Sequence, residues 1–208
     1  MAISSILLSL TAALQSVAPL PGPKLEPPVP LVTHRQLAER PSEFVGCEVR
    51  FVLQFHSIVE QWNPFVTRFS AHDYVGVEAW SDEQLPWIER DFERKAVRAF
   101  VRRGSFLDDF FRLGFRHERI AVRAVVREVF AGQPWIEILG AEATFESIPE
   151  GSILHVGRAL EFERQGAYGL ALSELERALS APLPPRAAKA VRGMKERFIE
   201  ARDKPKRR

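Results

Sequence analysis

Apolar residues recur at every second position through the middle of the chain, between residues 46 and 145. The clearest run places Val49, Phe51, Leu53 and Phe55 on one side of an extended segment. A period of two is typical of a strand with one buried face and one wetter face. Five further segments share the pattern and are predicted as strands: 65–69, 74–80, 97–101, 120–126 and 135–139.

Two short helices are predicted beside these strands from their capping residues. Thr33 and Gln36 have the spacing of a capping box, and Pro41 ends the helix that they begin. Ser105 caps a second helix, with Asp108 as its acidic partner three residues later. The second helix carries a dense apolar stripe that we expect to be buried: Phe106, Leu107, Phe110, Phe111 and Leu113.

Two segments of unusual composition precede the strand-rich region. Residues 2–18 are apolar and small and carry no charged side chain, a composition typical of a secretory signal peptide. Residues 19–30 contain six prolines, which favour an extended linker. We therefore expect residues 1–18 to be a signal peptide or an N-terminal membrane anchor. The alternative is an N-terminal helix that packs on the domain, in a cytoplasmic protein.

Apolar residues at helical spacing predict a helical segment over residues 148–203, followed by a basic tail at 204–208. Small residues let two helices approach closely, and a third helix after Pro185 caps the pair. The two-helix part resembles a single tetratricopeptide repeat. The positions that carry this resemblance are Ala159, Phe162, Gly166, Tyr168, Ala171, Leu172, Leu175, Ala178 and Leu179.

The order of strands and helix between residues 31 and 147 resembles an OB-fold, a small closed β-barrel. Leu37, Pro41 and the segment 44–46 leading into Val49 are similar to the usual approach to its first strand, and residues 132–138 to its closing hairpin. The resemblance implies an α+β fold: a five- to six-stranded antiparallel OB-like barrel, followed by a helical hairpin and a capping helix.

The resemblance also implies binding of single-stranded nucleic acid, but the charge distribution disfavours it. Residues 46–147 hold 13 basic and 16 acidic residues, whereas residues 148–208 hold 13 and 8. Binding along a phosphate backbone needs clustered Lys and Arg. Six arginines of the strands are candidates for one basic face near Trp62, Tyr74 and Trp80: Arg50, Arg68, Arg98, Arg102, Arg123 and Arg127. The alternative is that they are solvated and paired with Glu48, Glu78 and Glu128.

The sequence contains few candidates for catalytic or metal-binding residues. A single cysteine, Cys47, excludes an internal disulfide and a multi-cysteine zinc site, and its place at a strand start indicates a small core side chain. None of the five histidines has the spacing of paired metal ligands. No phosphate-binding glycine loop or nucleophile elbow is present. We therefore expect no cofactor, no metal and no enzymatic activity.

The first hypothesis is a non-enzymatic binding module, exported or membrane-tethered, that contacts a protein or a small ligand. The excess of Arg (23) over Lys (6) fits a GC-rich, bacterial source as well as a functional demand. The partner is expected to be a protein, and a homo-oligomer is an open alternative. The second hypothesis is a cytosolic protein that binds single-stranded nucleic acid. The expected ligand-binding residues are on the wetter side of the first strands: Arg50, Gln54, His56, Arg68, Tyr74 and Trp80.

Overall fold

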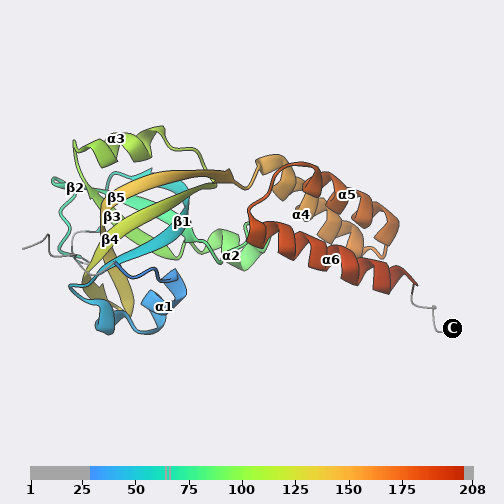
Figure 1. Ribbon diagram of the computed structural model, residues 1–208, viewed down its shortest axis with the longest axis horizontal. Coiled ribbons are helices and arrows are strands. Elements are labelled where there is room, and N and C mark those ends of the chain that lie inside the picture. The colour runs from blue at the N-terminus through green and yellow to red at the C-terminus, as the bar shows by residue number, and fades with distance from the viewer. Residues whose placement is uncertain (1–28, 64, 66, 204–208) are drawn as a thin grey trace, which may run out of the picture.

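Five strands form a sheet that closes into a ring, and three helices extend from it as a separate unit (Figure 1). The computed structural model describes residues 29–63, 65 and 67–203. Around the ring the order is β1-β2-β3-β5-β4, with β4 next to β1. The strands are β1 (Glu48–Val59), β2 (Tyr74–Ser81), β3 (Val97–Arg102), β4 (Glu118–Phe130) and β5 (Gln133–Ser147).

The fold class is α+β, and two details of the predicted sheet are wrong. The ring closes through a parallel pairing of β3 with β5, at Ala99–Ile136 and Phe100–Glu137, so the sheet is not wholly antiparallel. The segment predicted as a strand at 65–69 lies in the connection between β1 and β2. Phe69 of this segment packs against Phe100 on the outside of the ring, whereas Phe65 is 89% exposed.

The inside of the ring is filled by the alternating apolar residues that predicted the strands. Val49, Phe51, Leu53 and Phe55 of β1 are at most 4% exposed, as are their counterparts on the other strands. Leu37 of α1 (His34–Glu39) is fully buried in the same core. Burial of this apolar surface is the main stabilising contribution to the ring.

Short helices lie at opposite ends of the ring (Figure 1). At one end are α1 and the 3-10 helix η1 (Pro41–Phe44), and the predicted capping box of Thr33 with Gln36 is confirmed. At the other is α3 (Phe106–Leu113), where the Ser105 hydroxyl accepts a hydrogen bond from the Asp108 backbone N–H. Capping residues identified both helix starts because they satisfy backbone N–H groups locally.

The prediction that the whole apolar stripe of α3 is buried is wrong. Phe111 is fully buried and Leu107 and Phe110 are partly packed on the core, but Phe106 and Leu113 are 79% and 77% exposed. Five apolar residues in eight exceed what one face of a helix can direct inward. Phe106 and Leu113 are therefore open to solvent, on the same helix as the exposed Asp109. Cys47 is also exposed rather than buried, because it lies before β1 begins.

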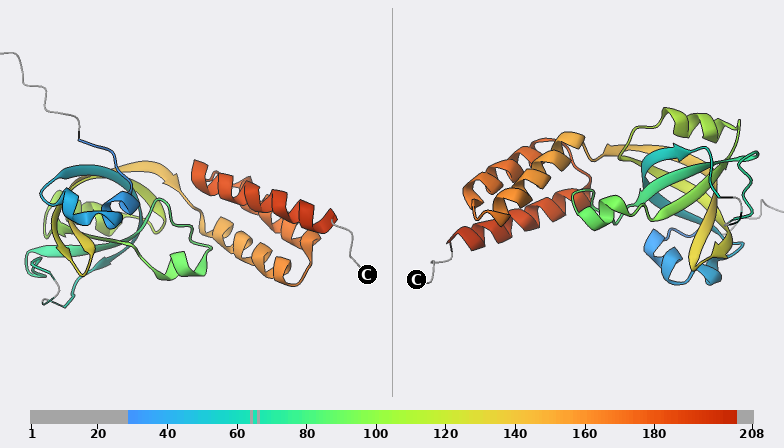
Figure 2. Two further views of the ribbon diagram at one scale, coloured as in Figure 1. Left: turned by 90° about the horizontal axis from the view of Figure 1, so that it is seen from below. Right: turned by 180° about the vertical axis from the view of Figure 1, so that it is seen from behind.

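The helical unit has its own core. It comprises α4 (Glu150–Arg164), α5 (Tyr168–Ser180) and α6 (Pro185–Asp203). Ala159, Ala171 and Ala178 are fully buried where the predicted close approach of two helices requires small residues. The connection that contains α2 (Glu89–Glu93) lies between the ring and this unit (Figure 2). Trp87 and Ile148 pack in the helical core and so join it to the ring.

The predicted signal peptide or anchor at 1–18, most of the linker at 19–30 and the basic tail at 204–208 lie outside the described residues. Within the part that is described, no helix combines the length and apolar character needed to cross a membrane. The end of the linker is described and has a fixed place. The carbonyl of Pro30 accepts a hydrogen bond from the Arg50 backbone N–H (2.8 Å), and Leu31 pairs with Arg50 in parallel.

Candidate functional site

The six predicted ligand-binding residues do not form one surface. Gln54 and Trp80 pair across β1 and β2 but are only 2% and 1% exposed. The Gln54 amide donates to the carbonyls of Ser81 (3.1 Å) and Gln84 (2.9 Å), and the Trp80 indole N–H donates to the carbonyl of Phe92 (3.0 Å). Both side chains are on the outer side of their strands and anchor the connection to α2.

His56 belongs to the same buried group. Its ring meets the edge of the Trp80 ring at 4.8 Å, and the ring of His117 stacks on Trp80 at 4.8 Å. Burial, together with the positive charges of Arg116 and Lys95, lowers the pKa of His56. Burial lowers the pKa of His117 to about 4. These rings are packing partners, and they offer no open surface to a ligand.

Arg50 lies on a different side of the ring, in the part of β1 that pairs with β4. Its partner across the strands is Arg123, whose guanidinium forms an ion pair with Glu48 (2.7 Å). Arg68 pairs with Glu128. The alternative from the sequence, that the arginines pair with Glu48, Glu78 and Glu128, is therefore right for Glu48 and Glu128, whereas Glu78 pairs with His56.

The remaining predicted residues, Arg68 and Tyr74, lie at the outer side of β2, β3 and β5. We call this surface the aromatic–arginine face. It is made by five aromatic rings and the arginines around them: Trp62, Phe69, Tyr74, Phe100 and Trp135, with Arg68, Arg98, Arg102 and Arg127. Four of the six arginines proposed for a basic face therefore come together, and Arg50 and Arg123 do not.

The aromatic rings of this face form a layer outside the sheet. Phe100 stacks on Phe69 at 4.2 Å and on Trp135 at 5.4 Å, and these three are 4–5% exposed. Trp62 and Tyr74 lie at the borders of the layer and are partly exposed. Stacked aromatic pairs at such spacings stabilise the packing by about 1 kcal/mol each beyond the buried area.

Two arginines are fixed on this face by one buried carboxylate. The Glu137 side chain is 4% exposed and accepts from Arg102 Nε (3.3 Å) at one oxygen and from Arg127 Nε (2.6 Å) at the other. Arg102 and Arg127 keep 72% and 49% of their side chains exposed. Their guanidinium groups are thus held from below while their outer N–H groups face solvent.

Aromatic rings of the face also lie beside two of its arginines. The guanidinium carbon of Arg102 lies 5.8 Å from the centre of the Tyr74 ring, and that of Arg98 lies 5.7 Å from the Trp135 ring. A cavity of about 130 Å³ opens beside Trp135, lined also by Trp62 and Arg98. The Trp135 indole N–H is buried there and has no acceptor among residues 29–63, 65 and 67–203.

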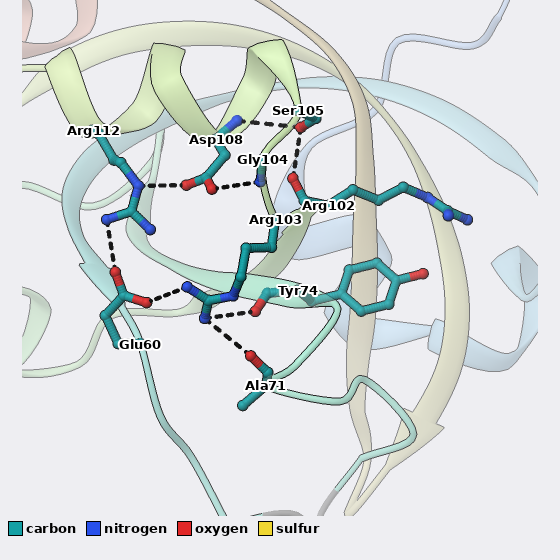
Figure 3. A network of polar contacts seen from close by, with 9 residues as sticks. All are labelled: Glu60, Ala71, Tyr74, Arg102, Arg103, Gly104, Ser105, Asp108 and Arg112. Atoms are coloured by element: carbon teal, nitrogen blue, oxygen red, sulfur yellow. Dashed lines mark hydrogen bonds and ion pairs between the residues drawn. The ribbon is translucent and has the colours of Figure 1, made fainter.

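A polar network fixes one end of the face (Figure 3). Glu60 accepts hydrogen bonds from Arg103 and Arg112, both at 2.7 Å, and these bonds lower the pKa of Glu60. Arg103 also donates to the carbonyls of Ala71 (3.0 Å) and Tyr74 (3.2 Å). The network ties the β1–β2 connection to α3 and leaves the Arg102 side chain extended beside the Tyr74 ring.

The sequence reading missed Phe100, Trp135 and Glu137 as members of the face. Their signal was available in part: Arg98, Phe100 and Arg102 alternate with the core residues of β3, and so point outward together. The pairing of β3 with β5 brings Trp135 and Glu137 beside them. That contact joins strands distant in sequence and has no local signature.

Comparison with known proteins assigns this chain to no family. No family model matches the chain, and no curated protein matches it. Among solved structures, a chain from Leishmania major Friedlin, provisionally named an aspartyl-tRNA synthetase, is similar at 12% identity with a TM-score of 0.40. The match covers 62% of this chain and 23% of that one.

The outward groups of the aromatic–arginine face are guanidinium N–H donors and the edges of the partly exposed rings. Such groups recognise anions that also carry planar rings. In the described part of the chain, no group of three His, Cys, Asp or Glu side chains is placed to hold a metal ion.

Proposed function

We propose that the ring of strands is an OB-type barrel and that the protein is a non-enzymatic module that binds single-stranded nucleic acid along the aromatic–arginine face. The fold supports the first part, because α3 lies between the third and fourth strands, as the resemblance requires. Of the two hypotheses from the sequence, the arrangement of this face favours the second.

The observation that carries the proposal is the Arg102–Glu137–Arg127 group. Arginines that are already ordered lose little side-chain entropy when a phosphate binds. Glu137 uses both oxygens to orient them, and the outer N–H groups remain free for phosphate oxygens. Arg102 is on β3 and Arg127 is on β4. A nucleic-acid strand whose phosphates contact both guanidinium groups therefore runs across the face from one to the other.

The acidic balance of residues 46–147 does not oppose this proposal, because charge acts locally at contact distance. At the face, Glu60, Glu128 and Glu137 are each engaged by arginines, and Glu78, which lines the cavity beside Trp135, lies 3.7 Å from His56. Other acidic residues of the region lie elsewhere, for example Glu48 beside Arg123 and Asp82 beside Arg119. Nucleic acid on the face therefore meets guanidinium groups first.

The aromatic layer adds contacts for bases at its borders. Trp62 and Tyr74 are partly exposed, so a base can stack against them, whereas Phe69 and Phe100 are covered. Phosphate contacts should dominate, with weak sequence preference. The face lies within residues 60–137, so the proposal applies to an exported chain and to a cytoplasmic one.

The salt dependence of oligonucleotide binding tests the proposal. Three or four phosphate contacts on a single strand predict that log K falls with log salt with a slope of about −2 to −3. Fluorescence anisotropy of a labelled 12-nucleotide strand between 50 and 200 mM salt gives that slope. Absence of binding at 50 mM salt, or an affinity independent of salt, would contradict the proposal.

The outer side of α3 favours a second candidate function, contact with another copy of the chain. Phe106 and Leu113 are seven residues apart on one face of the helix and are more than three-quarters exposed. Two apolar side chains on one helix face can pack against the same two side chains of a second copy across a two-fold axis. This candidate corresponds to the homo-oligomer that the sequence left open.

Sedimentation velocity tests self-association through α3. We expect dimers at micromolar concentration for the unchanged chain and monomers for Phe106→Ser/Leu113→Ser, because the apolar contact is removed. Leu154→Ser on α4 is the matched control, since Leu154 is also exposed (63%) but lies in the helical unit. A monomer at all concentrations before mutation would rule this function out.

A further inference from the structure

A cleft lined by basic side chains lies apart from the aromatic–arginine face, at the end of the ring that α1 covers. It has a volume of about 610 Å³ and is bordered by α1, the β2–β3 connection with α2, and the first residues of β3 and β5. Figure 1 shows α1 below the ring and α2 beside it, on the way to the helical unit. We call this hollow the basic cleft.

The lining of the basic cleft is strongly unbalanced in charge. Five basic side chains line it and only two acidic ones, Glu83 and Asp91, giving a local net charge of +3. The basic residues are Arg35, Arg90, Arg94, Lys95 and Arg98. Except for Arg90, none of these five forms an ion pair with any described residue.

The wall of the cleft is rigid before any ligand binds. The Gln84 side chain accepts from the backbone N–H groups of Ser81 (2.9 Å) and Ala96 (3.4 Å) and donates to the carbonyls of Asp91 (3.0 Å) and Arg94 (2.6 Å). The buried Gln54 amide donates to the Gln84 carbonyl from behind. The backbone that carries Arg94 and Lys95 is thus held in place before binding, which lowers the cost of ordering the loop around a ligand.

Two buried polar atoms beside the cleft lack partners. His34 is 4% exposed and lines the cleft, and its Nε2 has no hydrogen-bond partner in the described part of the chain; the same holds for Oε2 of Glu83. Burial lowers the pKa of His34 to about 4, so the ring is neutral at pH 7. Buried polar atoms are nearly always paired, so these two mark a place for polar groups of a ligand.

We propose that the basic cleft binds a small phosphorylated molecule that also carries hydroxyl groups. Arg35, Arg94 and Lys95 contact its phosphates, and His34 Nε2 and Glu83 Oε2 pair with its hydroxyls. A neutral imidazole and a carboxylate suit hydroxyls, whereas the surrounding cations suit phosphate. The volume is in the range of small-molecule sites. Arg98 stands at the border between this cleft and the aromatic–arginine face.

Isothermal titration calorimetry of the full chain tests the proposal with fructose 1,6-bisphosphate and inorganic pyrophosphate as probes. Both should bind, fructose alone should not, and sulfate should bind at least tenfold more weakly than either probe. Arg94→Gln/Lys95→Gln should weaken both probes at least tenfold. His34→Phe should weaken the sugar bisphosphate at least fivefold and leave pyrophosphate within threefold, because only the hydroxyl contacts are lost.

Variants of the aromatic–arginine face separate this proposal from the proposed function. Arg102→Gln/Arg127→Gln/Glu137→Gln should leave binding of both probes unchanged, and Arg94→Gln/Lys95→Gln should leave the oligonucleotide affinity within threefold. The cleft proposal is overturned if neither probe binds, or if both bind equally well to the Arg94→Gln/Lys95→Gln variant. It is also overturned if that variant alone abolishes binding of the oligonucleotide together with the probes, because the cleft would then be the nucleic-acid site.

Discussion

Arg102→Gln/Arg127→Gln/Glu137→Gln should weaken binding of a labelled single strand at least tenfold at 50 mM salt. Two phosphate contacts are lost, so the salt slope should also decrease by about 1.4, at about 0.7 for each phosphate contact on a single strand. Glu137 is changed together with its partners because a carboxylate that is 4% exposed would otherwise be left buried without a counter-charge. Anisotropy titrations at several salt concentrations give both quantities.

Arg123→Gln is the matched control for this experiment. It removes an arginine of β4 with similar exposure (53%) that pairs with Glu48 on another side of the ring. Its affinity should stay within twofold of the unchanged chain, because it contacts no part of the aromatic–arginine face. Equal losses for Arg123→Gln and for the triple variant would indicate diffuse attraction to charge and would sink the proposed site.

Acidification from pH 6.5 to about 4.5 should destabilise the fold by several kcal/mol. Burial lowers the pKa of both His34 and His117 from 6.5 to about 4, so the unfolded chain binds protons in this range that the folded chain excludes. Stability from these groups is complete above pH 6.5 and is lost as the pH falls toward 4. Each histidine contributes up to about 3 kcal/mol, at 1.36 kcal/mol per pKa unit.

Urea unfolding at pH 7.5 and pH 4.8, in buffers without phosphate, measures this loss. His34→Gln/His117→Asn should reduce the pH dependence over this interval to the part that comes from His56, whose pKa burial also lowers, and asparagine suits the positive φ (67°) at position 117. His72→Gln is the control, because the His72 side chain is 92% exposed. Carboxylates whose pKa is lowered, such as Glu60 and Glu174, change the free energy of unfolding mainly below pH 4.5, outside the measured interval. An unchanged free energy of unfolding between the two pH values would contradict the assignment.

Local chemistry was predicted well from the sequence. The caps at Thr33 and Ser105, the alternating core of β1 and the small residues between α4 and α5 each depend on neighbours within a few positions. Such interactions leave a periodic or positional mark on the chain. These patterns predicted the order of the strands along the chain and a separate helical segment after them.

The prediction of ligand-binding residues was wrong for side chains that are buried by a segment outside their own strand. Gln54 and Trp80 occupy the outer side of β1 and β2, which alternation predicts as the wetter face. The connection from Ser81 to Ala96 folds back over them and uses their polar atoms as hydrogen-bond donors. A strand covered on both sides gives no sequence signal of which outer residues a loop will bury.

By itself, the sequence of this protein determined the five strands of the ring, the capped helices α1 and α3, and the strand residues that face the core, because these properties depend on local spacing. Only the tertiary structure decided that β3 pairs in parallel with β5, that Arg102 and Arg127 meet on Glu137, and that Arg94 and Lys95 share a cleft with His34. These groups come from elements distant along the chain, and closure of the ring brings them together. Both proposed binding sites therefore exist only in the folded chain.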